Sequence, residues 1–348
     1  MELTDVWFGL IAVLWIGYFF LEGFDFGVGI LLPVVGRDET DRRVMINTIG
    51  PVWDGNEVWL LVAGGATFAA FPEWYASLFS GFFLALLLVL LALIVRGVAF
   101  EYRGKVDDAG WRRRWDLAIF WGSAVPALLW GVAFANIVRG VPLNANHDYT
   151  GTLLTLLNPY GLLGGLVTLG LFTLHGAFYL ALKTDGPVRE RSNAIARRVA
   201  PAVVVVAAAF LVWTQLRGGR PLSWALTLAA AVLLVAAVVA NRHGREGWAF
   251  ALLGTTLALA VSSLFATLYP DVLPSSTDPA NSLTTTNAAS TDYTLGVMTW
   301  VAAFLTPVVL GYQAWTYWVF RRRISREHIP AVPVDLPRPR RPRTGTPA

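Results

Sequence analysis

The chain has 348 residues, of which 55% are hydrophobic and only 14% are charged, and its mean hydropathy is +0.55. Soluble domains carry about 25% charged residues, so this composition excludes a large soluble core and predicts an all-α polytopic membrane protein. The absence of cysteine excludes disulfides, iron–sulfur clusters and thiolate metal sites within the chain.

Nine apolar segments reach the length of about 20 residues that one membrane crossing needs. They lie at 6–35, 51–71, 75–98, 116–139, 158–182, 199–216, 222–240, 248–269 and 293–320. The acidic start MELTD is unlike the basic start of a cleavable signal, so we expect a retained first helix. The sequence thus predicts a transmembrane domain over 1–320. An arginine- and proline-rich tail follows over 321–348, and its composition predicts disorder.

The basic residues predict how this domain is oriented. With the N-terminus outside, 24 of the 27 Lys and Arg residues fall on the inner side, and only Arg139, Arg217 and Arg220 remain outside. Such an excess is the usual signature of cytoplasmic loops. The prediction is nine spans with the N-terminus outside and the C-terminus cytoplasmic. The positive charge then serves orientation at an anionic lipid surface, and no nucleic acid is expected.

Four carboxylates lie inside or at the edge of the first two apolar segments: Glu22, Asp25, Asp54 and Glu57. A charged carboxylate at mid-membrane costs roughly 3 kcal/mol, so such groups persist when they are protonated, paired or lining a polar path. Glu22 and Asp25 are three residues apart, as are Asp54 and Glu57, so each pair shares one helix face.

Further titratable residues collect in the same half of the predicted bundle: Arg96, Glu101, Asp116 and His175. Two hypotheses stay open at this point. The first is a set of buried ion pairs, with Arg96 balancing Asp54 or Asp25. The second is a chain of carboxylates that conducts protons from the cytoplasm.

The histidines limit what this chain can do with haem. Of the four, only His175 lies in a predicted span, so a bis-histidine haem within the chain is excluded. A single haem on His175 stays open, but a hydrogen-bonded interior histidine is the favoured interpretation. The loop over 270–292 contains no basic residue and is rich in Ser, Thr, Asn and Pro, which predicts an exposed loop or cap, with a solvated connector as the favoured interpretation.

Motifs along nearly the whole chain resemble subunit II of the cytochrome bd-type quinol oxidases. They include GFDFGVG at 23–29, WDGNEVWL at 53–60, VRGVAFEYRGK at 95–105, WRRRWDLAIFWGS at 111–123, GVAFANIVRGVP at 131–142, LLNPYGLLGG at 156–165 and VMTWVA at 297–302. WDGN and GFDxGVG together in one membrane protein form a specific signature.

This resemblance implies two four-helix bundles plus one peripheral helix in a bacterial plasma membrane. It implies a haem-free chain that pairs with a subunit I carrying two b haems and one d haem, in a complex that oxidises quinol and reduces dioxygen to water. In such oxidases, subunit II contributes to proton uptake, and the motif acids correspond to Asp54 and Glu101. Asp25 also matches a motif acid. Glu22 and Glu57 are further relay candidates, and Arg96 is expected to act as a charge partner within this group of acids.

The resemblance leaves open a structural quinone in this chain, small accessory subunits and the choice of quinone. It assigns no metal or cofactor to residues of this chain. A rival hypothesis is a stand-alone proton-coupled transporter, since transporters also hold carboxylates inside helix bundles. A purely scaffolding subunit is a third alternative.

Overall fold

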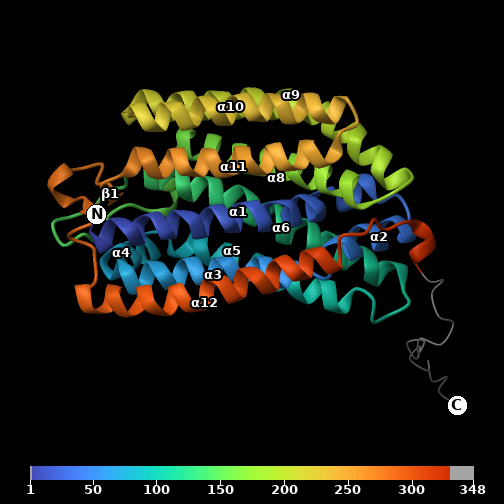
Figure 1. Cartoon of the computed structure of the whole chain (residues 1–348), viewed down its shortest axis with the longest axis horizontal. Coiled ribbons are helices and arrows are strands. Elements are labelled where there is room, and N and C mark those ends of the chain that lie inside the picture. The colour runs from blue at the N-terminus through green and yellow to red at the C-terminus, as the bar shows by residue number, and fades with distance from the viewer. Residues whose placement is uncertain (1, 330–348) are drawn as a thin grey trace, which may run out of the picture.

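The computed structural model describes residues 2–329, and this part of the chain is almost entirely helical (Figure 1). In chain order the helices are α1 (Leu3–Val35), α2 (Glu39–Ile49), α3 (Trp53–Ala70), α4 (Pro72–Gly81), α5 (Phe83–Tyr102), α6 (Ala109–Arg139), α7 (Leu153–Leu156), α8 (Pro159–Lys183), α9 (Pro187–Gly218), α10 (Pro221–Arg242), α11 (Glu246–Leu268) and α12 (Asp292–Val319). Two short strands, β1 (Asp271–Leu273) and β2 (Leu283–Thr284), and two 3₁₀ turns, η1 (Pro279–Asn281) and η2 (Arg326–His328), complete the described residues.

Eight helices among residues 2–329 are long and apolar enough to cross a membrane, namely α1, α5, α6 and α8 to α12. The predicted span 51–71 corresponds to α3, which is not one of the eight. The predicted span 75–98 is divided between α4 and α5 at Phe82, next to the point where the ring of Tyr149 packs against Gly81. The all-helical membrane class is confirmed, whereas the count of nine spans stays a prediction.

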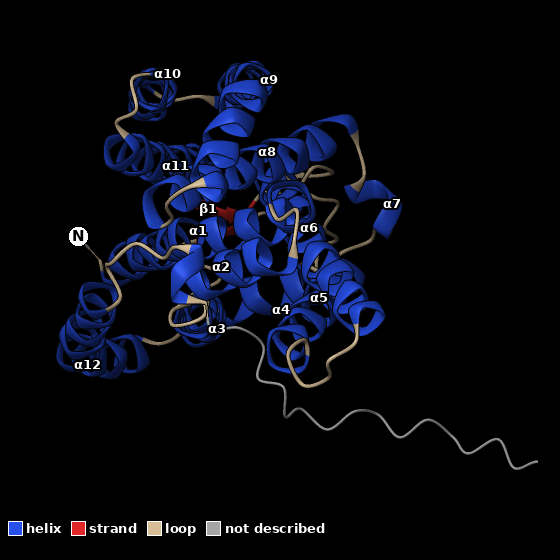
Figure 2. Cartoon of the chain, turned by 90° about the vertical axis from the view of Figure 1, so that its right-hand side faces the viewer, coloured by secondary structure: helices blue, strands red, loops and turns tan. Residues whose placement is uncertain are grey.

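The helices form layers around α1 (Figures 1 and 2). Helices α9 and α10 lie outermost on one side, α8 and α11 come next, α1 and α6 occupy the middle, and α3, α4, α5 and α12 cover the opposite side. Glycines allow the closest crossing. A Cβ added to Gly27 of α1 would lie 2.0 Å from the carbonyl oxygen of Phe172 and 2.7 Å from the Cα of Gly176 in α8. Small residues of this kind let two membrane helices approach closely.

Two loops pack together at the end of the molecule that carries the N-terminus and β1. Val141 pairs with Ser275, and its N–H donates to Pro274 O at 3.0 Å. The side chain of Asn281 donates to Leu143 O at 3.1 Å, and Leu273 is fully buried. The expectation of a solvated connector over 270–292 is therefore wrong, because backbone pairing and buried apolar residues hold this loop against residues 140–157 as a cap.

Residues 321–329 lie at the opposite end, beside α2 (Figure 1). Arg323 pairs with Asp185 and Glu246, each at 2.9 Å. Arg326 pairs with Asp38 at 2.8 Å and with Asp41 at 3.1 Å. We call this segment and its four acidic partners the tail clasp. The prediction of disorder over 321–348 is therefore wrong for residues 321–329, which these ion pairs hold against the bundle. The rest of the predicted segment, residues 330–348, lies outside the described residues.

Candidate functional site

A buried cluster of charge lies where α1, α3 and α5 meet. Glu22 of α1 and Arg96 of α5 are both fully buried, and Nη2 of Arg96 contacts Oε1 of Glu22. The same Nη2 lies 3.5 Å from Oε2 of Glu57, whose side chain is 23% exposed. The guanidinium also packs 4.7 Å from the centroid of the Phe26 ring. The sequence had named Asp54 or Asp25 as partners of Arg96, but the residues that it contacts are Glu22 and Glu57.

Asp25 lies one helical turn from Glu22 and has a different partner. Its Oδ2 accepts a hydrogen bond of 2.7 Å from Nδ2 of Asn56 on α3. Oδ1 of Asn56 in turn accepts from the hydroxyl of Tyr317 at 2.7 Å and from Nε2 of Gln313 at 3.4 Å. Both of the latter residues come from α12, so this helix contributes directly to the buried cluster.

Several atoms of the cluster have no protein partner within residues 2–329. They are Oε2 of Glu22, Oδ1 of Asp25, and Nε and Nη1 of Arg96. Glu22 and Glu57 pair with a single guanidinium, and Asp25 lies one helical turn from Glu22, so three carboxylates lie near one cation. Because like charges in a buried site repel one another, this excess of carboxylates favours the binding of protons. The arrangement can therefore hold and exchange protons.

Asp54 and Glu101 lie apart from this buried cluster. Both side chains are exposed, and neither makes a hydrogen bond or an ion pair with the rest of residues 2–329. Asp54 lies in the first turn of α3, three residues before Glu57. Glu57 thus lies between the exposed Asp54 and the buried acids, since it shares a helix face with Asp54 and also reaches Arg96. The structure divides the six predicted site residues into four clustered and two exposed.

A second ionic network surrounds the end of α5. Arg103 pairs with Asp116 at 2.6 Å and with Glu39 at 2.8 Å, and Arg42 pairs with Asp116 at 2.9 Å. In the nearby tail clasp, the N–H of Asp41 and then the guanidinium of Arg326 lower the pKa of Asp38 below its usual value. These pairs connect α2, α5 and α6 and the segment 321–329 at one end of the bundle.

Sequence reasoning missed Asn56, Gln313 and Tyr317. A signal was present for each of them. Asn56 follows Asp54 within WDGN. Gln313 and Tyr317 are four residues apart in a largely apolar segment, so they share one helix face. That Gln313 and Tyr317 contact Asn56 could be found only from the packing of α12 against α3.

His175 is fully buried, and neither of its ring nitrogens has a hydrogen-bond partner in the described chain. Its ring lies 4.6 Å from the centroid of Phe250 and 5.6 Å from that of Phe20, and it stacks on Phe24. The expected hydrogen-bonded histidine is therefore wrong. His175 packs as one ring of an aromatic cluster. The described residues also contain no group of three His, Cys, Asp or Glu side chains placed to hold a metal.

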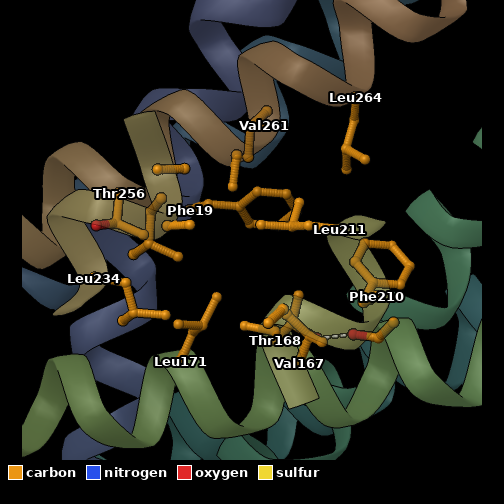
Figure 3. Close-up of a pocket in the computed structure, with 18 of the residues that line it drawn as sticks. Phe19, Val167, Thr168, Leu171, Phe210, Leu211, Leu234, Thr256, Val261 and Leu264 are labelled. Atoms are coloured by element: carbon orange, nitrogen blue, oxygen red, sulfur yellow. Dashed lines mark hydrogen bonds between the residues drawn. The ribbon is translucent and has the colours of Figure 1, made fainter. Parts of the chain in front are cut away.

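An apolar cavity of about 230 Å³ lies among α8, α9, α10 and α11 (Figure 3). The polar side chains that line it are Thr168 and Thr256, and both hydroxyls donate to backbone carbonyls, at 2.6 Å to Ala127 and 2.9 Å to Leu252. The cavity therefore suits an apolar chain. It presents no uncommitted side-chain donor for the carbonyl oxygen of a quinone.

The chain was then compared with known proteins. The family model described as "Cytochrome bd terminal oxidase subunit II" matches residues 3–320. The chain belongs to this family. Among its relatives, the cytochrome bd ubiquinol oxidase subunit 2 of Bacillus subtilis is 44% identical over 336 residues, which cover 94% of this chain and 98% of the relative. The cytochrome bd-I ubiquinol oxidase subunit 2 of Escherichia coli is 40% identical over 365 residues, covering 94% and 96%.

The fold of this subunit II chain is also similar to that of a solved structure. A chain of the bd oxidase from Geobacillus thermodenitrificans superposes with a TM-score of 0.73 at 18% identity, covering 92% of this chain and 99% of that one. Membership of the subunit II family and the eight apolar helices make this a multi-pass protein of the bacterial inner membrane. It is a terminal-oxidase subunit, so the stand-alone transporter hypothesis is not retained.

Proposed function

We propose that this chain is the proton-conducting subunit of a quinol-oxidising complex that reduces dioxygen to water. The quinol substrate is the one printed in the names of the relatives. Electron transfer would take place on the two b haems and the d haem of a partner subunit I, since the described residues of this chain offer no haem ligand pair. The observation that carries the proposal is the set of three carboxylates around Arg96.

The route that we propose begins at Asp54 and Glu101 and enters the bundle through Glu57. From Glu57 it continues past Arg96 to Glu22 and Asp25. The steps from Asp54 to Glu57 and from Glu22 to Asp25 join residues of one helix face, and the steps through Arg96 join adjacent helices. The protons would come from the cytoplasm, with the N-terminus outside and the end that carries α2 and the tail clasp inside.

We also propose that subunit I covers the face formed by α3 and α5. Leu61 of α3 is 72% exposed, and Ile94 and Val95 of α5 are 52% and 45% exposed. Asp54 and Glu101 are exposed on the same two helices, so a partner that covers this face would bury both acids. Nine spans, arranged as two four-helix bundles plus the peripheral helix α12, fit this assembly. Accessory subunits and a structural quinone stay open.

The proposal is tested by oxygen consumption with a quinol, measured on the co-purified two-subunit complex with wild-type protein and with Asp54→Asn. Haem spectra are recorded on the same samples. Lost turnover with intact haem spectra is the expected result. Unchanged turnover and proton uptake would mean that the chain acts only as a scaffold for its partner. Loss of the haems would mean that Asp54 mainly stabilises the contact between the subunits. Glu73→Gln, at an exposed acid of α4, is the matched control.

A further inference from the structure

Helix α12 is unusual because it is almost unburied. Of its 28 residues only Leu295 is buried, and large side chains such as Phe304 and Val308 are 72% and 69% exposed. Its polar contacts with the bundle are concentrated at a few positions. In the half that is followed by the tail clasp, Gln313 and Tyr317 reach the same atom, Oδ1 of Asn56.

The hydrogen bonds around Gln313 have only one consistent direction. The indole N–H of Trp59 is a donor and never an acceptor, and it lies 2.9 Å from Oε1 of Gln313. The carboxamide of Gln313 therefore turns its NH₂ group toward Asn56, where it needs an acceptor. Trp59 is itself held in place, since its ring packs where a Cβ on Gly17 would lie, 2.1 Å from the nearest ring atom.

The order of donor and acceptor is continued by Asn56, which accepts from α12 and donates to Asp25. Oδ1 of Asn56 accepts from Gln313 and from Tyr317, so its NH₂ group faces Oδ2 of Asp25 at 2.7 Å. An NH₂ group can donate to a carboxylate but cannot accept from a protonated acid. A protonated Asp25 accepts this bond only at its carbonyl oxygen, and more weakly than the carboxylate does, so the donor chain from Trp59 through Gln313 and Asn56 favours the charged form of Asp25.

We propose that Gln313 and Tyr317 are positioning residues for Asp25, which fix the orientation of the Asn56 amide and so set the pH range in which Asp25 exchanges protons. This inference rests on the proposed role of Asp25 in proton conduction. Neither α12 residue touches Asp25 itself. Both act through Asn56.

Other charged and titratable groups also face Asp25. They are Glu22 from α1, Glu57 from α3, Arg96 from α5, Tyr179 from α8 and Tyr317 from α12. The hydroxyl of Tyr179 donates to Thr48 O at 2.8 Å, so it is committed elsewhere. Arg96 is engaged by Glu22 and Glu57. The direct hydrogen bond on Asp25 within residues 2–329 comes from Asn56, which is why the orientation of this amide matters.

The test is the pH profile of quinol-driven oxygen consumption in the two-subunit complex, with Tyr317→Phe as the variant. Without the hydroxyl, Asn56 can turn its carbonyl toward Asp25, and a carbonyl favours the protonated acid. The pH of half-maximal rate should then rise by about half a unit to one unit, the equivalent of one ordinary hydrogen bond. Gln313→Met should shift it less, because its bond to Asn56 is longer. Tyr312→Phe, on an exposed tyrosine of the same helix, should leave the profile unchanged.

The double variant Asn56→Leu with Tyr317→Phe separates positioning from a general effect on folding. If Tyr317 acts through Asn56, then Tyr317→Phe causes no further shift in the Asn56→Leu background. An equal shift in both backgrounds would overturn the inference. Loss of the haem partner in both Tyr317→Phe and Gln313→Met would also overturn it, because these residues would then be merely structural.

Asp25→Asn distinguishes the two proposals. Wild-type behaviour of Asp25→Asn contradicts the proton role of Asp25. Impaired Asp25→Asn together with an unshifted Tyr317→Phe contradicts only the positioning role.

Discussion

The carboxylate of Glu57 lies 3.5 Å from the guanidinium of Arg96, and its side chain is 23% exposed while that of Arg96 is fully buried. Glu57 therefore stands at the boundary between the surface of α3 and the interior of the bundle. The residue on one side of it is the exposed Asp54, and on the other side lies the pair of Arg96 with Glu22. A proton that moves between surface and interior along this route has to pass Glu57.

We expect Glu57→Gln to reduce turnover by about tenfold or more while the haem spectra stay intact, because the amide keeps the size of the side chain but cannot carry a proton. The measurement is oxygen consumption with a quinol at several pH values. Full turnover of Glu57→Gln at all of them would remove Glu57 from the route.

Arg96 should be the residue whose loss affects folding most. Arg96→Leu leaves three carboxylates without their cation, and breaking a buried pair in this way typically costs roughly 3–5 kcal/mol. The expected result is poor recovery of the complex. Arg96→Lys keeps the charge and should restore much of the yield. A normal yield of Arg96→Leu would show that the acids are held protonated without help from Arg96.

The crossing of α1 and α8 gives a prediction that does not depend on proton transfer. A Cβ at Gly27 would lie 2.0 Å from Phe172 O, which is backbone and cannot move aside alone. Gly27→Ala should therefore lower the yield and the thermal stability of the complex. Gly9→Ala on the same helix is the control, since a Cβ there meets nothing within 4 Å. Equal stability of the two variants would contradict the close crossing.

The tail clasp should contribute measurable stability. Arg323→Ala removes the pairs with the exposed Asp185 and the buried Glu246. Because Arg323 itself is partly exposed, we expect a loss of about 1 kcal/mol and an apparent melting temperature lower by roughly 2–4 °C. Arg322→Ala provides the control because Arg322 is exposed and its side chain makes no ion pair in the described chain. A larger effect of Arg322→Ala than of Arg323→Ala would argue against the clasp.

The clasp also has an expected pH dependence. The pKa of Asp38 is lowered in the folded chain, so its contribution to stability is present above the pKa of the unfolded chain, about 3.9, and is lost as the pH falls through the lower folded value. Protease cleavage after Arg322 or Arg326 should be slow at neutral pH, and the amide hydrogens of residues 321–329 should be less protected from exchange when they are measured below the folded pKa of Asp38. Asp38→Asn should make cleavage faster at neutral pH as well.

The spanning helices could be predicted because a long apolar run needs no knowledge of its neighbours. The expected segments at 158–182 and 248–269 correspond to α8 and α11 within one or two residues. Helices α6 and α9 begin earlier than expected, at Ala109 and Pro187, because their first turns are polar and extend beyond the apolar run. The apolar run locates the hydrophobic part of a helix but does not locate its first turn.

The partners of the charged residues could not be predicted in the same way. The sequence named Asp54 or Asp25 as the partner of Arg96, whereas the observed partners are Glu22 and Glu57, because the pairing depends on how α1, α3 and α5 rotate about their axes. The packing of His175 among phenylalanines and the clasp on Arg323 likewise depend on residues far apart in sequence. Such pairings are set by tertiary structure.

The position of α12 along the chain has a consequence for biogenesis. The ribosome delivers α1, α3 and α5, and with them Glu22, Asp25, Asn56 and Arg96, long before it delivers Gln313 and Tyr317. During synthesis the polar centre therefore exists for a time without the residues that orient Asn56. The arginines that fasten the clasp come later still. The amide chain toward Asp25 can therefore be completed only after the buried acids and Arg96 have been synthesised.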